Sequence, residues 1–310
     1  MAGGQERILR RRIRSIQATK KITRAMELIA ASRIVKAQGR VQAAVPYSNT
    51  ITEVARNLAA AGAGANHPLL VPRSEVKRVA HIAFAADRGL CGGYNTAVIR
   101  AVEAEMRAHG TLGREYDLIV VGRKAESYFR YREFRITAAF TGMTDSPTYE
   151  NAREIAAAVD DRFLSGEVDL VQVVYTRFVS AGRQEVVVRP LMPLDRAGFQ
   201  ESDAHPAGGA ALYEFEPAPE VLLDRLLPRY AEARVWAALL NAAASEHAAR
   251  QRAMKAATDN AEDLITSLTR VMNRARQDSI TTEIMEIVGG AESLRQGAES
   301  YHDELSKEPI

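Results

Sequence analysis

The chain has 310 residues, of which 46% are apolar and 26% are charged, with a net charge of +2. This composition can bury the core of one large or two ordinary domains, which excludes disorder of the whole chain. The only cysteine is Cys91, so no intramolecular disulfide exists and the cytoplasm is favoured. No run approaches the roughly eighteen apolar residues that span a bilayer, so we expect a soluble or peripheral protein.

Residues 1–62 are expected to form a long helix. No Pro occurs between Gln5 and Val45, and Pro46 can kink the helix without ending its pattern. Apolar residues recur at helical spacing with one shift of phase: Leu9, Ile13, Ile16, Ile22, Met26, Ile29, Ala37, Val41 and Ala44. Residues 63–75 contain Gly, Asn and Pro, and we expect them to form a linker.

This first helix is strongly basic, with eleven Lys or Arg and a single acid between Arg7 and Arg40. Such charges can bind nucleic-acid phosphates or an anionic membrane. An apolar stripe of forty residues argues against both, because a free phosphate-binding arm does not need one. Two interpretations stay open: a solvated outer face of a coiled coil, or contact with an acidic protein surface.

Residues 76–212 are expected to form a Rossmann-like α/β domain. Short segments rich in β-branched residues alternate with stretches of helical length, which predicts a mainly parallel sheet with helical crossovers. The segment EVVVRPLMPL is predicted to be an edge strand, because Pro190 and Pro193 cannot donate to a central ladder. The expected strands are near 78–86, 116–122, 134–140 and 168–178.

Residues 213–294 are expected to form the second long helix. Arg229 to Val288 contains neither Pro nor Gly and would extend about 90 Å as a helix. A compact globule of this length has a radius of gyration of only about 20 Å, so the helix should protrude. A heptad seam predicts a partner helix, and an antiparallel coiled coil with residues 1–62 supplies it. The predicted seam residues are Met254, Ala257, Ala261, Leu264, Leu268, Val271 and Ala275.

The predicted seam is interrupted at two places. Extended toward the N-terminus, its register passes over His247 and Arg250. After Ala275 it slips, at Arg276 and Gln277, before apolar residues resume at Ile280. Packing alone does not require such interruptions, so we expect these polar side chains to face outward, away from the partner helix.

No site for chemistry emerges from the motifs. The segment DRGLCGGYN follows a predicted strand but matches neither dinucleotide- nor mononucleotide-binding glycine loops, which favours a tight turn or a subunit contact. Cys91 lacks a paired histidine for nucleophilic catalysis. The six histidines are scattered without metal-ligand spacing. We therefore expect no catalytic residue, cofactor or metal.

Four blocks of sequence resemble the gamma subunit of the F-type ATP synthase. They are SIQATKKITRAMELIAASRIVKAQ, AADRGLCGGYN, ASEHAARQRAMKAATDNAEDLI and NRARQDSITTEIMEIVGGAESL. The resemblance covers Met1 to Leu294. It implies a non-catalytic central rotor shaft that couples proton-driven rotation of the membrane c ring to conformational change in the catalytic beta subunits for ATP synthesis.

The resemblance also implies partners and contact residues. The implied partners are the alpha and beta subunits, the epsilon subunit and the c ring, with one copy of the chain per complex at the cytoplasmic face of the plasma membrane. Nucleic acid is not an implied partner. Positions that match the family's contacts with the catalytic head are Met26, Arg250, Arg276, Gln277 and Thr281. Tyr213 and Glu214 are the candidates for contact with the c ring or epsilon.

The sequence departs from the family in two respects. Residues 295–310 form an acidic extension beyond GGAESL, which we expect to be disordered and dispensable for assembly. The cysteine pair of the chloroplast form is absent, so we expect no thiol switching through this subunit. The alternatives are an α/β nucleotide-dependent enzyme with a coiled-coil arm and a basic coiled-coil nucleic-acid binder; binding assays with ATP, NAD and duplex DNA separate these.

Overall fold

The computed structural model describes the backbone of residues 2–60, 67–194 and 216–305. It divides into two compact units, one of residues 26–254 and one that joins residues 1–25 to residues 255–310. Two long terminal helices and a mostly parallel sheet are present, which confirms the predicted α/β class. Within the described ranges, no helix is both long and apolar enough to cross a membrane.

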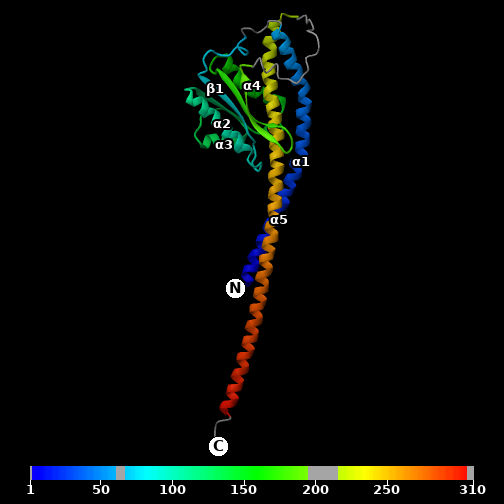
Figure 1. The fold of residues 1–310 in the computed structure, drawn as a ribbon, viewed down its shortest axis with the longest axis vertical. Coiled ribbons are helices and arrows are strands. Elements are labelled where there is room, and N and C mark those ends of the chain that lie inside the picture. Colours follow the sequence, from blue (N-terminus) through cyan, green and yellow to red (C-terminus); the bar gives the residue numbers. More distant parts are fainter. Residues whose placement is uncertain (1, 61–66, 195–215, 306–310) are drawn as a thin grey trace. The chain divides into compact units, whose positions relative to one another are not determined.

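The sheet has five strands in the order β3-β2-β1-β4-β5 (Figure 1). The first four strands of the chain run parallel, and β5 pairs antiparallel with β4 at the edge, which confirms the predicted edge strand. The strands are β1 (Arg78–Phe84), β2 (Glu115–Val121), β3 (Ile136–Phe140), β4 (Leu170–Phe178) and β5 (Gln184–Met192). The crossover helices are α2 (Tyr94–Thr111), α3 (Arg123–Tyr131) and α4 (Tyr149–Leu164).

Alternate residues of each central strand enter two different cores. Leu118 and Val120 of β2 pack in one core with residues of α2 and α3. Ile119 and Val121 of the same strand pack in the other core, with α4 and with the two long helices. The sheet is therefore covered on both faces, as parallel sheets generally are.

The C-terminal helix α5 (Pro219–Leu305) is built into the second core along its first part. Every side chain from Ala242 to Ala248 is buried. A helix that is buried on all sides must be enclosed by other elements. Here the neighbours are the sheet and the second half of α1 (Ala2–Ala60), which contributes Ile51 and Ala55 to the same core.

Helix α1 follows a heptad pattern without the predicted shift of phase. Ile22 and Ile29 were expected on the apolar seam, but both are exposed. The seam instead runs through Lys20, Thr23 and Glu27, so polar residues hold the register where the apolar pattern breaks. Buried or half-buried positions alternate in steps of four and three along the whole helix: Leu9, Ile13, Ile16, Lys20, Thr23, Glu27, Ala30, Ile34, Ala37, Val41, Ala44, Ser48, Ile51, Ala55 and Leu58.

The predicted seam of α5 is wrong at alternate positions. Leu264 is 52% exposed and Val271 is 50% exposed, whereas the neighbouring Ile265 and Met272 are half-buried. The less exposed side of the helix includes four of the predicted residues: Met254, Ala261, Leu268 and Ala275. Each seam position between them lies one residue later in the chain than predicted.

The smaller unit shows the direction in which its two helix segments run. Lys20 Nζ lies 3.0 Å from a carboxylate oxygen of Glu262, and the hydroxyls of Thr23 and Thr258 are 2.8 Å apart. Higher numbers in one segment thus face lower numbers in the other. The two segments are antiparallel.

The helix boundaries differ from the predicted limits at two places. Helix α5 begins at Pro219, whereas residue 213 was expected, and the predicted end of the first helix at residue 62 lies outside the described residues. Beyond Leu294, where we expected disorder, α5 continues as a helix to Leu305. The expectation rested on the scarcity of apolar residues in this segment, and polar residues do not interrupt a helix that is already formed.

Candidate interaction surface

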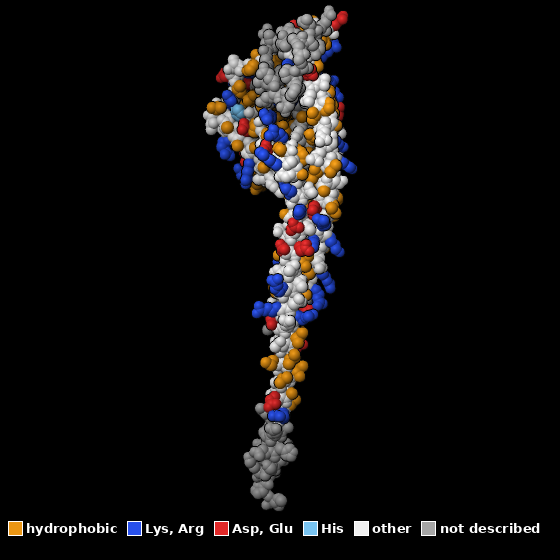
Figure 2. All heavy atoms as spheres, turned by 45° about the vertical axis from the view of Figure 1, so that its right-hand side comes forward, with side chains coloured by type: hydrophobic (Ala, Val, Ile, Leu, Met, Phe, Trp, Pro, Cys, Tyr) orange, Lys and Arg blue, Asp and Glu red, His pale blue; other side chains and the backbone are white. Residues whose placement is uncertain are grey.

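The last described turns of α5 carry large apolar side chains that nothing in the described chain covers. Every side chain from Ile280 to Arg295 is exposed. Figure 2 shows orange apolar side chains gathered along this stretch. Monomeric proteins rarely expose such a continuous apolar surface, so it indicates a binding partner. The large apolar residues are Ile280, Ile284, Met285, Ile287, Val288 and Leu294.

Of the predicted contact residues, Thr281 lies on this exposed part of α5, and Arg276 and Gln277 lie just before it. All three are exposed, as the slip of the seam predicted for Arg276 and Gln277. Met26 of α1 is half-buried. Tyr213 and Glu214 lie outside the described residues.

Arg250 differs from the expectation that it faces outward. Its side chain is 9% exposed and forms an ion pair of 2.7 Å with Glu246, which is almost fully buried. Its guanidinium also donates to the backbone oxygens of Arg88, at 3.5 Å, and Gly89, at 3.3 Å. The interruption in the seam was a real signal, but the Arg250 side chain does not face outward and instead contacts the loop after β1.

A second buried contact involves His247, whose Nε2 lies 3.2 Å from the backbone oxygen of Asp145 in the loop after β3. Burial lowers the pKa of His247, although the nearby Asp145 opposes this shift. Burial also raises the pKa of Glu246, against the effect of Arg250. The Asp145 carboxylate in turn accepts from Arg33 of α1.

Donor atoms of Asp145, Glu246 and His247 lie within 4.8 Å of one another, which is a spacing that could hold a metal ion. The charges around them argue against this use. Arg33 contacts the Asp145 carboxylate and Arg250 contacts that of Glu246, so both carboxylates are already paired with cationic side chains. The cluster is better described as a buried polar contact among α1, α5 and the α/β domain.

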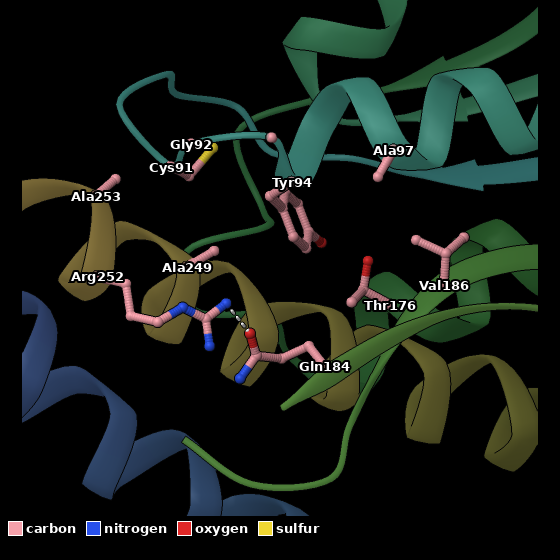
Figure 3. A pocket seen from close by; sticks show the side chains of 11 residues that line it. Cys91, Gly92, Tyr94, Ala97, Thr176, Gln184, Val186, Ala249, Arg252 and Ala253 are labelled. Atoms are coloured by element: carbon pink, nitrogen blue, oxygen red, sulfur yellow. Dashed lines mark hydrogen bonds between the residues drawn. The ribbon is translucent and has the colours of Figure 1, made fainter. Parts of the chain in front are cut away.

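The glycine loop after β1 lies where open α/β sheets generally bind ligands, since the strand order reverses between β1 and β4. A cavity of about 430 Å³ opens there (Figure 3). However, Ala249, Arg252 and Ala253 of α5 form one wall of this cavity. The hydroxyl of Tyr94, at the start of α2, donates to the backbone oxygen of Ala242 in α5 at 3.2 Å. Helix α5 therefore takes up much of the crevice that a nucleotide would need.

Cys91 is 1% exposed, and burial raises the pKa of its thiol. Asn95 donates to its sulfur at 3.1 Å. A protonated, enclosed thiol is a poor nucleophile. The glycine loop after β1 therefore packs against helix α5, in agreement with the predicted structural role.

Comparison with known proteins adds the family. The sequence profile described as ATP synthase matches residues 5–294. The chain is 51% identical over 299 residues to the ATP synthase gamma chain of Frankia casuarinae, covering 95% of this chain and 99% of that protein. It is 48% identical over 302 residues to the ATP synthase gamma chain of Mycolicibacterium smegmatis, covering 93% of this chain and 97% of that protein.

Two solved structures resemble the fold. The Euglena gracilis mitochondrial ATP synthase, in its OSCP/F1/c-ring part, contains a chain with a TM-score of 0.67 and 16% identity, covering 99% of this chain and 98% of that one. The structure of the central stalk and c ring of the Tetrahymena thermophila mitochondrial ATP synthase contains a chain with a TM-score of 0.56 and 23% identity. The match covers 76% of this chain and 99% of that one. At these identities the likeness concerns the fold alone.

Proposed function

The chain belongs to the ATP synthase gamma chain family, and from this premise we propose that its exposed C-terminal helix enters the catalytic head of the complex. Members of this family are non-catalytic rotor subunits of the F-type ATP synthase. The rotor role follows from membership. How this particular chain meets its neighbours is our proposal.

The apolar surface from Ile280 to Leu294 is the observation that carries the proposal. A free helix with this surface would aggregate, whereas a helix enclosed by a ring of subunits would have it covered. The ring that suits it is formed by the alpha and beta subunits. The α/β domain is then left to contact the epsilon subunit and the c ring, with Tyr213 and Glu214 as candidates.

In this arrangement one copy of the chain serves each complex and is peripheral to the membrane through the c ring, at the cytoplasmic face of the plasma membrane. Proton flow turns the ring, and the shaft presents a different face to each beta subunit in turn. Subunits in different surroundings populate open and closed states differently, because each contact favours one state. Rotation of the asymmetric shaft thereby drives ATP synthesis.

Arg276 and Gln277 are the proposed polar contacts with the catalytic subunits, together with Met26 and Thr281. Hydrogen bonds to charged groups contribute roughly 1.5 to 3 kcal/mol each. A difference of this size shifts a two-state subunit about tenfold or more. It is small beside the packing of the whole shaft, so its loss should impair turnover without preventing assembly.

The test is Arg276→Ala with Gln277→Ala in the purified complex. We expect normal subunit content, slower ATP hydrolysis and weaker ATP-driven proton pumping. The matched control is Asn273→Ala with Arg274→Ala, which removes the same two chemical groups from exposed positions one turn earlier. Equal activities of the two variants would show that Arg276 and Gln277 are only solvated surface.

A further inference from the structure

The middle part of α5 is attached to the α/β domain by polar contacts that point in three directions. Asn241, Ser245 and Arg252 face β4 and the turn before β5: Asn241 accepts from the Phe178 N–H at 3.2 Å, and Ser245 donates to the Thr176 oxygen at 2.9 Å. Arg252 donates to the oxygens of Ala181 and Gly182, at 3.0 and 2.9 Å.

The other contacts leave the helix elsewhere on its circumference. With about 100° per residue, Asn241, Ser245 and Arg252 fall within roughly 40° of one another. On the same scale Arg250 lies on nearly the opposite side from Asn241, and His247 lies about 120° from it. Arg250 contacts the loop after β1, and His247 contacts the loop after β3. The α/β domain thus holds α5 from three sides.

Between Asn241 and Arg252 the buried apolar residues of the helix are all alanines: Ala242, Ala243, Ala244 and Ala248. Alanine side chains offer little interlocking, so within this stretch apolar packing alone would resist rotation of the helix about its own axis only weakly. Directional hydrogen bonds fix an orientation that such packing leaves loosely defined.

The loops that receive these contacts are themselves held together. The Asp87 carboxylate accepts from the backbone N–H groups of Arg123, Gly142 and Thr144 at 2.9 to 3.1 Å. These bonds join the ends of β1, β2 and β3. An anchor in these loops therefore transmits force to the whole sheet.

We propose that Glu246 and Arg250, together with His247, are positioning residues that lock the rotational setting of α5 on the α/β domain, so that torque applied to the domain turns the shaft. This inference rests on the proposed rotor arrangement, because it requires the domain and the exposed part of α5 to meet different partners. Its specific content is that the lock is polar and local, at residues 246–250.

The test replaces the ion pair by apolar side chains of similar length, Glu246→Met with Arg250→Met. An apolar pair avoids leaving one charge buried alone, and such replacements usually preserve the fold. The control is Asp117→Leu with Arg162→Met, which removes another largely buried pair, 2.6 Å apart, that lies on β2 and α4. A third variant, Arg250→Lys, keeps the charge but not the planar fork of donors.

The measurement uses the purified complex with its head immobilised and a bead attached to the α/β domain through Tyr131→Cys, an exposed position. The angular fluctuations of the bead give the torsional stiffness between domain and head. We expect at least a twofold loss of stiffness in the Met pair, a partial loss in Arg250→Lys, and no loss in the control. Unloaded ATP hydrolysis should stay within twofold in all three.

Unchanged stiffness in the Met pair would overturn the proposal, whether or not its hydrolysis is slower. Equal loss in the control would also overturn it, because the effect would then be general softening of the domain. If the Met pair does not assemble, Arg250→Lys decides by the same criterion. Failure of the rotor arrangement itself has a different signature, since the unmodified chain would then not co-purify with the catalytic subunits.

Discussion

Thr23 and Thr258 share a hydrogen bond, with their hydroxyl oxygens 2.8 Å apart on the seams of the two antiparallel helix segments. A polar pair on an otherwise apolar seam favours one register, because any sliding leaves hydroxyls without this partner. Such a pair contributes to specificity more than to overall stability.

The first prediction concerns that pair. Thr23→Val or Thr258→Val alone should lower the free energy of unfolding by about 1 to 2 kcal/mol, because the remaining hydroxyl loses its hydrogen bond across the seam. The double Val variant should be less destabilised than the sum of the two. Urea unfolding followed by circular dichroism gives the coupling energy of this cycle. A coupling energy of zero would mean that the hydroxyls do not act together.

The second prediction concerns pH and His81. Burial, and then the neighbouring His109, lower the pKa of His81 from 6.5 to about 4. Between pH 6.5 and pH 4 the unfolded chain binds a proton at His81 that the folded chain does not bind. The free energy of unfolding therefore falls as the pH drops from 6.5 to 4. The loss reaches roughly 3 kcal/mol. Unfolding monitored by the fluorescence of Trp236 should show this dependence of stability on pH. His81→Leu should remove the contribution of His81 to it.

The third prediction has the opposite sign. Burial, and then Glu232 and Asp161, raise the pKa of Asp160 from 3.8 to about 7. The folded chain therefore holds a proton that the unfolded chain has released, and stability falls as the pH rises from 4 to 7. Asp160→Asn should add roughly 4 kcal/mol at most at pH 8. Asp161→Asn, at an exposed position, is the control and should change much less.

The fourth prediction tests the packing at the end of β2. Gly122 has a φ of +98°, and a Cβ there would lie 2.2 Å from the Ala85 oxygen. Gly122→Ala should destabilise the chain by roughly 4 kcal/mol or more and greatly reduce the yield of folded protein. Gly110→Ala, in helix α2 with open space around it, should instead be neutral or slightly stabilising. Yield and thermal midpoints compare the two.

The fifth prediction concerns the bare end of α5. The isolated chain should aggregate when its concentration is raised above that of the unfolding measurements, and Ile284→Ser with Ile287→Ser should reduce aggregation while weakening assembly with the catalytic subunits. Leu112→Ser with Leu164→Ser removes two exposed side chains of similar size from the α/β domain and should do neither. Light scattering and co-purification measure the two effects. Improved solubility with undiminished assembly would show that this surface is not the contact.

Much of the fold could be predicted from the sequence because its signals are local. The absence of Pro and Gly between Arg229 and Val288 predicts a helix by itself, and Pro190 marks an edge strand. The register of α5 was less accessible. Leu264 and Ile265 are adjacent and equally apolar, so spacing alone could not decide which one faces the partner. The polar seam residues Thr23 and Thr258 gave no apolar signal at all.

The candidate surface was predictable in part for the same reason. The break in the seam correctly indicated that Arg276 and Gln277 are exposed. The break at Arg250 led to the same expectation, which was wrong about the orientation of the side chain. Its acceptors are backbone oxygens about 160 residues earlier in the chain, and a backbone oxygen has no sequence pattern. Only the fold brings the two together.

The burial of Cys91 has a practical consequence. It is the single cysteine of the chain, and its side chain is enclosed while burial keeps the thiol protonated. Maleimides and similar reagents require an accessible thiolate. A cysteine introduced at an exposed site, such as Tyr131 or Thr281, should therefore be labelled selectively in the otherwise natural chain. Fluorophores or spin labels can then report motions of the domain and of the helix end separately, with no need to replace the native cysteine.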